Sequence, residues 1–348
     1  MKGCGCKVPR DSLLELLGEL QKGVKHGVDE DGHIDIGLDS CVIPSKHKGV
    51  SLVQTTDFFY PLVDDPFLMG RITCANVLSD LYAMGVHECD NMLMLLGVCT
   101  ELDDSSRNIV ISEFLKGFKQ AADLADTRVR GGQTVRCPWL LLGGVASSVV
   151  ADSEILRVDQ AKPGDVLVLT KPLGGQVAVN SYEWIKANPE KITSMNLNEE
   201  KIRIAFRQVS EQMCRLNRNA AKLLHKYGAR ASTDVTGFGI LGHAENLAKA
   251  QANDVNFVIE TLPIIEYMDE ISQKYPDKNG FRLFSGYAAE TSGGLLIAMP
   301  AENAEKYIQE IQELDGFPAW VIGKVTEGNK TATIVPEYKI VSVPSIIE

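Results

Sequence analysis

The stretch that decides the fold runs from Val50 to Val98 and reads VSLVQTTDFFYPLVDDPFLMGRITCANVLSDLYAMGVHECDNMLMLLGV. Residues 50–56 are rich in β-forming side chains and predict a strand. Asp65 and Pro66 have the form of a helix N-cap followed by proline at the first helical position, and the predicted helix continues to about Met84, with Gly85 as its stop. Residues 90–98 predict a second, strongly apolar strand.

Strands and helices alternate along the rest of the chain as well. Further helices are predicted at 11–20, 106–126, 199–227, 264–272 and 301–314, and one after Gly239. Further strands are predicted at 139–150, 166–170, 256–260, 294–299, 320–325 and 331–335. This order indicates an α/β or α+β fold, without short repeats or low-complexity tracts.

The length suggests two domains, since the chain has 348 residues and a domain usually takes roughly 100–200. The composition shifts over the polar stretch 151–164, and we place the domain boundary there. The prediction is a flexible Cys/Lys arm with a leading helix (1–30), an N-terminal domain (31–150) and a C-terminal α/β domain (151–348).

The composition excludes several classes of protein. The net charge of −11, from 35 basic and 46 acidic residues, argues against broad binding of nucleic acid or anionic membranes. No apolar run reaches the roughly 18 residues of a membrane span, and the first residues lack a secretory core. The eight cysteines are too sparse for a disulfide scaffold. We therefore expect a cytoplasmic protein.

Four aspartates interrupt or end apolar segments, where an unpaired carboxylate is costly: Asp39, Asp57, Asp80 and Asp234. Carboxylates gathered without thiolate or imidazole partners suit Mg²⁺. Asn76 lies four residues before Asp80 on a predicted helix, so the two share a face. Taken singly, each aspartate also has a structural explanation, such as a turn or an N-cap. The sequence does not show that the four converge.

Two glycine-rich segments predict turns. Gly131-Gly132-Gln133-Thr134 follows a short strand-like segment and could offer backbone N–H groups to an anion, although a plain turn is the alternative. Residues 237–242 match GxGxxG literally, but the segment before them, 230–234, is polar. We expect no incoming strand there, so a tight turn into a helix fits better than a dinucleotide site.

The N-terminal arm carries Cys4-Gly5-Cys6-Lys7. The charge of Lys7 would lower the pKa of a neighbouring thiol, and the glycines would let a thiolate move. The alternative is an unimportant terminal tail. Among the histidines, we expect His243 to have a packing or hydrogen-bonding role.

Together these segments resemble the selenophosphate synthetase (selenide, water dikinase) family in its animal-like form, over nearly the whole chain. The resemblance lies in residues 3–9, 37–44, 54–98, 131–138, 167–174, 233–243 and 290–295. The GCGCK arm is specific to this family, whereas the other blocks are shared more loosely with aminoimidazole ribonucleotide synthetase-like proteins. Family members usually have a longer polar segment before the Cys motif, which only Met1 and Lys2 precede here.

The resemblance implies two α/β domains. It makes 31–150 the domain that binds ATP and metal ions and that pairs with its counterpart in a second subunit to form a homodimer. It implies the reaction of ATP, selenide and water to selenophosphate, AMP and phosphate, which supplies the selenium donor for selenocysteine synthesis. It also implies a need for Mg²⁺ and a dependence on K⁺.

The resemblance assigns roles to individual residues. Cys4 matches the catalytic cysteine or selenocysteine, and Lys7 a lysine that contacts the nucleotide phosphates. Metal ligands are implied at Asp39, Asp80 and Asp234, with Asp57 as a further acidic residue of the metal and nucleotide site and Asn76 as a supporting group. Nucleotide contacts are implied at Lys7, Gly37, Leu38, Asp39, Asp57, Asp80 and at Gly131, Gly132, Gln133 and Thr134, a phosphate-cradling turn supplied across the dimer.

Three alternatives remain open at this point. The first is a non-catalytic, ATP-binding homologue of the same family, but such relatives replace the cysteine that is present here as Cys4. The second is a thiol redox protein that uses Cys4 and Cys6. The third is a nicotinamide dehydrogenase that uses the turn at 237–242.

Overall fold

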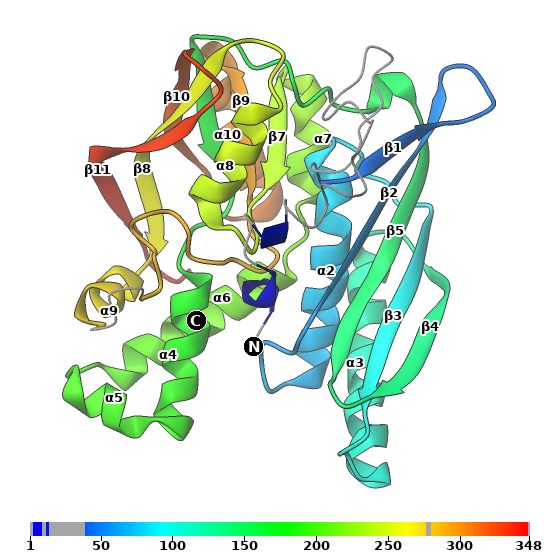
Figure 1. Ribbon diagram of the computed structural model, residues 1–348, viewed down its shortest axis with the longest axis vertical. Coiled ribbons are helices and arrows are strands. Elements are labelled where there is room, and N and C mark those ends of the chain that lie inside the picture. Colours follow the sequence, from blue (N-terminus) through cyan, green and yellow to red (C-terminus); the bar gives the residue numbers. More distant parts are fainter. Residues whose placement is uncertain (1–2, 9–11, 14–38, 276–279, 347–348) are drawn as a thin grey trace.

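A computed structural model describes residues 3–8, 12–13, 39–275 and 280–346. The helix predicted at 11–20 lies largely outside these residues. In the described parts, each half of the chain forms one mixed sheet, and helices pack between and beside the two sheets (Figure 1). The predicted α/β class is confirmed.

The first half forms a five-stranded sheet in the order β1-β2-β5-β3-β4. Only β3 and β4 pair in parallel, and the other neighbours are antiparallel. The strands are β1 (Cys41–Pro44), β2 (Val50–Phe59), β3 (Asn91–Cys99), β4 (Val129–Cys137) and β5 (Leu141–Ala151). The predicted strands at 50–56, 90–98 and 139–150 correspond to β2, β3 and β5.

Helix α2 (Pro66–Ala83) lies between the two halves, with α3 (Asp104–Leu124) beside it on the same face of the first sheet (Figure 1). The predicted start of α2 is confirmed, because the Asp65 carboxylate accepts hydrogen bonds from the backbone N–H groups of Phe67 and Leu68 at 2.8 and 3.1 Å. Most of α2 is buried, as expected for a helix that is apolar around most of its circumference. It contacts elements of both halves.

The second half forms a six-stranded sheet in the order β11-β8-β10-β6-β9-β7. Its strands are β6 (Asp165–Leu169), β7 (Ala231–Asp234), β8 (Val255–Ile265), β9 (Leu295–Pro300), β10 (Trp320–Glu327) and β11 (Ala332–Val343). Its helices are α4 (Gly175–Ala187), α5 (Pro189–Ser194), α6 (Glu199–Cys214), α7 (Arg218–Lys226), α8 (Gly239–Lys249), α9 (Met268–Lys274) and α10 (Ala301–Asp315). Short 3-10 turns occur at Cys4–Cys6 and Asp152–Glu154.

The single helix predicted at 199–227 is wrong, because the chain leaves the helical conformation at Arg215 and forms two helices, α6 and α7. The break serves packing between the halves. The buried Asn217 side chain donates hydrogen bonds to the Ser79 hydroxyl of α2 at 3.0 Å and to the Gly293 carbonyl at 2.8 Å.

The expectation that no strand precedes the 237–242 turn is also wrong. β7 occupies this place, and all four of its residues are buried despite their partly polar composition. β7 pairs antiparallel with β9 at the edge of the second sheet, with Asp234 opposite Leu295. A dinucleotide-binding βαβ unit needs a parallel strand here, so this pairing does not support the dehydrogenase alternative.

Candidate active site

The N-terminal arm lies between the two halves of the chain (Figure 1). Gly3 forms an isolated bridge to Tyr60 through a 3.0 Å bond from its N–H, and the Cys4 N–H donates to the Thr291 hydroxyl at 3.0 Å. Cys4 is only 1% exposed. The sequence suggested a flexible arm. Backbone hydrogen bonds anchor it instead.

The Cys4 thiol faces polar groups of the first half. Its Sγ atom lies 3.5 Å from Asn76 Oδ1. Burial and the nearby Asp57 carboxylate raise the pKa of Cys4 well above its ordinary value, and Lys7 opposes them only in part. Lys7 thus lowers the pKa of this thiol, as expected, but burial and Asp57 outweigh it, so the thiol of the seated arm stays protonated at neutral pH. Cys6 is oriented differently, since its Sγ donates to the Gly3 carbonyl at 2.7 Å.

Asn76 and Asp80 lie on the same side of α2, as predicted, and both meet β2. Asn76 Nδ2 donates a hydrogen bond to Asp57, and the Thr55 hydroxyl donates to Asp80. Burial raises the pKa of Asp80 well above its ordinary value, and the charges of other carboxylates, first Asp234, add to this effect. The strand β2 and the helix α2 thus bring two of the predicted aspartates to one site.

Asp39 and Asp234 complete the cluster from two distant segments. Thr233, at the end of β7, donates its hydroxyl hydrogen bond to Asp39 Oδ1 at 3.0 Å. Burial and the charge of Asp234 raise the pKa of Asp39 well above its ordinary value. Burial likewise raises the pKa of Asp234 to about 6. The negative charges of the carboxylates at 39, 57, 80 and 234 therefore repel one another. The site favours carboxyl groups that are protonated or bound to a cation.

The site fits a hard divalent cation. Asp234 is 1% exposed, and its Oδ2 atom is buried without a hydrogen-bond partner. Ligand atoms of Asp39, Asp234 and His243 lie within 4.8 Å of one another. An orphaned carboxylate oxygen among other carboxylates is typical of a metal ligand.

The sequence did not indicate that His243 lies beside these carboxylates. His243 lies near the start of α8. Its Nε2 atom accepts a hydrogen bond from the Thr236 N–H at 3.1 Å, in line with the expected hydrogen-bonding role. Its position seven residues beyond Thr236, across a tight turn, is the only signal that could have located it.

Lys7 provides a positive charge at the same site. Burial alone would lower its pKa, but the surrounding anionic groups, chiefly the Asp57 carboxylate, outweigh this effect and raise it. The ammonium therefore remains charged at neutral pH beside the carboxylates. This combination suits a ligand that brings both phosphates and metal ions.

The predicted turn at Gly131-Gly132-Gln133-Thr134 is wrong, because these residues lie inside the edge strand β4 and are exposed. Gly132 is required by strand packing. Its φ is +137°, and a β-carbon there would lie 1.9 Å from the Met94 carbonyl oxygen of β3. Gly37 and Leu38 lie outside the described residues.

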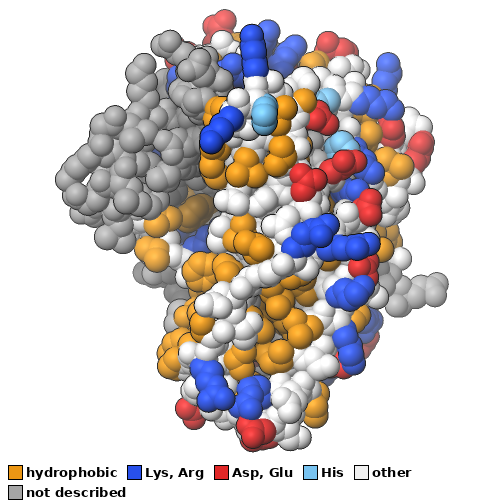
Figure 2. Space-filling view, turned by 90° about the vertical axis from the view of Figure 1, so that its right-hand side faces the viewer, with side chains coloured by type: hydrophobic (Ala, Val, Ile, Leu, Met, Phe, Trp, Pro, Cys, Tyr) orange, Lys and Arg blue, Asp and Glu red, His pale blue; other side chains and the backbone are white. Residues whose placement is uncertain are grey.

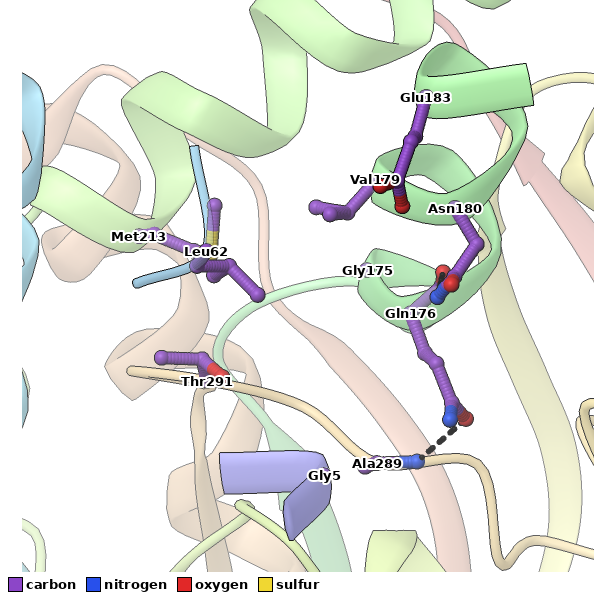
Figure 3. A pocket seen from close by; sticks show the side chains of 10 residues that line it. All are labelled: Gly5, Leu62, Gly175, Gln176, Val179, Asn180, Glu183, Met213, Ala289 and Thr291. Atoms are coloured by element: carbon purple, nitrogen blue, oxygen red, sulfur yellow. Dashed lines mark hydrogen bonds between the residues drawn. The ribbon is translucent and has the colours of Figure 1, made fainter. Parts of the chain in front are cut away.

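A cavity of 320 Å³ lies beside the arm, with Gly5 in its lining (Figure 3). It is lined by Gly5 and Thr291 and by polar side chains of α4, among them Gln176 and Asn180. Gln176 Oε1 accepts a hydrogen bond from the Ala289 N–H at 3.1 Å. The loop that carries Ala289 and Thr291 therefore forms one wall of this cavity.

Comparison with known proteins assigns the family. The family model described as AIR synthase related protein, N-terminal domain matches residues 37–150, and the corresponding C-terminal domain model matches residues 162–336. A probable selenide, water dikinase from Caenorhabditis elegans is 65% identical over 352 residues, covering 100% of this chain and 92% of the relative. The chain belongs to the selenide, water dikinase family.

Other members of the selenide, water dikinase family support this assignment. Selenide, water dikinase 2 of Homo sapiens is 48% identical, covering 99% of this chain and 82% of the relative. The family's enzymes are named as kinases. No helix in the described residues is both long and apolar enough to cross a membrane.

Solved structures with the same fold are more distant in sequence. Thiamine monophosphate kinase from Aquifex aeolicus has a TM-score of 0.66 at 19% identity, covering 96% of this chain and 98% of that one. The hydrogenase maturation protein HypE from E. coli has a TM-score of 0.61 at 15% identity, covering 94% of each chain. These likenesses establish the fold alone.

Proposed function

We propose that this protein converts ATP, selenide and water to selenophosphate, AMP and phosphate, and so supplies the selenium donor for selenocysteine synthesis. The observation that carries the proposal is the seating of Cys4 and Lys7 of the arm against one cluster of four carboxylates. A thiol, a cation and metal-binding carboxylates are the groups that phosphoryl transfer to a selenium species would use.

Asp39, Asp80 and Asp234, with Asp57, would hold Mg²⁺. When bound, the metal would neutralise the charge of the nucleotide phosphates and polarise the phosphoryl group that is transferred. Neighbouring side chains orient the carboxylates that would bind the metal. The Thr233 hydroxyl donates to Asp39 and the Asn76 amide donates to Asp57, so each of these carboxylates is oriented by a neighbour and keeps one oxygen for a ligand.

Lys7 and Cys4 are proposed to act on the substrates. The Lys7 ammonium would contact the phosphates and stabilise charge as a phosphoryl group is transferred. Cys4 would handle the selenium species. Since burial and Asp57 raise the pKa of its thiol in the seated arm, a thiolate requires that the arm open or that a cation offset Asp57.

A homodimer is proposed through the face of the first sheet that α2 and α3 leave uncovered in Figure 1. Apolar side chains gather on this side of the molecule, seen in Figure 2, and Phe58, Val135 and Val149 are 58%, 49% and 58% exposed. An exposed apolar sheet face marks an interaction surface. In such a dimer, Gly131 to Thr134 of the exposed strand β4 could approach the nucleotide bound by the partner subunit.

The remaining assignments are part of the same proposal. K⁺ is expected to support activity, and the protein is expected to act in the cytoplasm. The domain boundary is proposed within 151–164, since the first sheet ends at Ala151 and the second begins at Asp165.

Selenide-dependent formation of AMP from ATP tests the proposed function, with phosphorus NMR to identify selenophosphate. ATP turnover that is independent of selenide, or a lack of turnover with Mg²⁺ and K⁺ present, would contradict it.

Light scattering at the assay concentration tests the dimer. Phe58→Glu is the disrupting variant, and Val321→Glu, on the second sheet and 44% exposed, is its control. A fully active wild-type monomer would contradict a site shared between subunits.

A further inference from the structure

The turn between β7 and α8 lies directly against the N-terminal arm. A β-carbon built on Gly237 would lie 2.4 Å from the Cys4 carbonyl oxygen and 2.9 Å from Cδ of Lys7. Both the backbone of the arm and the aliphatic part of Lys7 therefore occupy space that a side chain at position 237 would fill. The glycine of this turn makes room for the arm.

Phe238, the next residue of the turn, lies under the charged end of Lys7. The Lys7 Nζ atom is 5.7 Å from the centre of the Phe238 ring, within the range of a cation–π interaction. The same ring packs against His243 with 5.6 Å between ring centres, and His243 is held by the Thr236 N–H at 3.1 Å. The ring thus belongs to a packed and hydrogen-bonded turn.

We propose that Phe238 is a positioning residue that holds Lys7, and with it Cys4, in the closed arm. None of the ion pairs formed within the described parts of the chain involves Lys7. An aromatic ring attracts an ammonium group without neutralising it, whereas a carboxylate bound directly to Lys7 would compete with a phosphate. Phe238 therefore fixes the ammonium and leaves its charge available to the substrate.

The role in phosphate binding rests on the proposed function, but closure of the arm can be measured without activity. Cys4 is 1% exposed when the arm is seated, so its alkylation reports opening. The full chain is treated with iodoacetamide, and modification of each cysteine is followed by mass spectrometry. The exposed Cys41 and the fully buried Cys74 serve as internal references.

Phe238→Leu should increase the rate of Cys4 alkylation by about 2- to 30-fold, the factor that corresponds to a cation–π contact. Phe238→Tyr, which keeps the ring, should restore the wild-type rate. Gly237→Ala should also expose Cys4, because its β-carbon would collide with backbone. Lys7→Met should expose Cys4 as well, and combining it with Phe238→Leu should add little, because both remove the same contact.

Wild-type alkylation of Cys4 in Phe238→Leu would overturn the proposal, as would full additivity in the double variant. A parallel increase at Cys74 would assign the effect to general loosening of the protein and would also overturn it. If alkylation behaves as expected and the wild-type protein forms no selenophosphate, the positioning of the arm stands and the proposed function fails.

Discussion

Asn76 is hydrogen bonded to Ser292 across the two halves of the chain: its Oδ1 atom accepts from the Ser292 N–H at 2.8 Å. The amide nitrogen of the same side chain donates to Asp57, and Oδ1 also lies 3.5 Å from the Cys4 thiol. One buried amide therefore joins helix α2, strand β2, the arm and the loop that receives the arm.

Asn76→Asp should destabilise the protein by about 1–3 kcal/mol, because a carboxylate would face Asp57 where a donor now lies. Urea unfolding at neutral pH without metal measures the loss. Asn108→Asp is the matched control, since Asn108 is exposed on α3. A loss no larger than that of the control would show that the amide does not hold this site together.

Asp80→Asn should reduce ATP turnover by about a hundredfold or more, because the cluster would lose a proposed metal ligand. Without metal, the variant should be at least as stable as the wild type, since the repulsion that raises the pKa of Asp80 is removed. Differential scanning calorimetry with and without Mg²⁺ checks this, and Mg²⁺ should stabilise the wild type more than the variant.

Asp123→Asn controls for a general effect of charge, because Asp123 is 57% exposed and pairs with Lys119 on α3. Near-normal turnover of Asp80→Asn at limiting Mg²⁺ would remove Asp80 from the metal site. Equal stabilisation of both proteins by Mg²⁺ would argue the same way.

The sequence predicted the elements that have strong local signals. Pro66 and the Asp65 cap located the start of α2, and the apolar runs located β3 and β5. β7 was missed because its four residues, ASTD, are short and partly polar, and their burial depends on neighbours distant in sequence. The break at Arg215 was missed because neither glycine nor proline marks it, and packing by Asn217 determines it.

The sequence could predict which residues form the candidate site, but it could not predict the pKa values of their side chains. Isolated polar residues in apolar segments identified the aspartates, which the fold gathers around Asp234. The adjacent Lys7 suggested a thiolate at Cys4, but burial and Asp57 dominate the pKa of that thiol, and both depend on where the arm lies. Gly132 was assigned to an anion-binding turn because sequence cannot distinguish such a glycine from one that lets two strands approach.

Cys4→Ser should abolish selenophosphate formation and leave ATP binding largely unchanged, because the carboxylate cluster remains. Cys6→Ser should retain substantial activity, since the Cys6 thiol donates to the Gly3 carbonyl and a serine hydroxyl can do the same. Both variants are assayed side by side at saturating selenide, with ATP binding measured by calorimetry. An inactive Cys6→Ser beside an active Cys4→Ser would reverse the roles of the two thiols.

Glu290 predicts a dependence of stability on pH. Its carboxylate is buried and accepts hydrogen bonds from the Gly174 and Gly175 N–H groups at 2.7 and 3.0 Å, where α4 begins. Burial raises its pKa from 4.5 to about 8. The folded state therefore binds a proton more tightly than the unfolded chain does. The stability that this group contributes is fully present below pH 4.5 and is lost as the pH rises through about 8.

Glu290→Gln should remove this dependence, because the amide stays neutral and its carbonyl oxygen, in the place of Oε1, can still accept from the Gly174 and Gly175 N–H groups, which lie 2.7 and 3.2 Å from Oε1 in the wild type. Relative to the wild type, the variant should gain stability between pH 6 and pH 9, by up to about 1.4 kcal/mol per pH unit below the folded pKa. The free energy of unfolding is measured in urea across this range. Glu302→Gln, on the exposed first turn of α10, should follow the wild-type curve. Parallel curves for Glu290→Gln and the wild type would mean that Glu290 is ionised in the folded protein throughout, and that the N–H groups of α4 offset the cost of its burial.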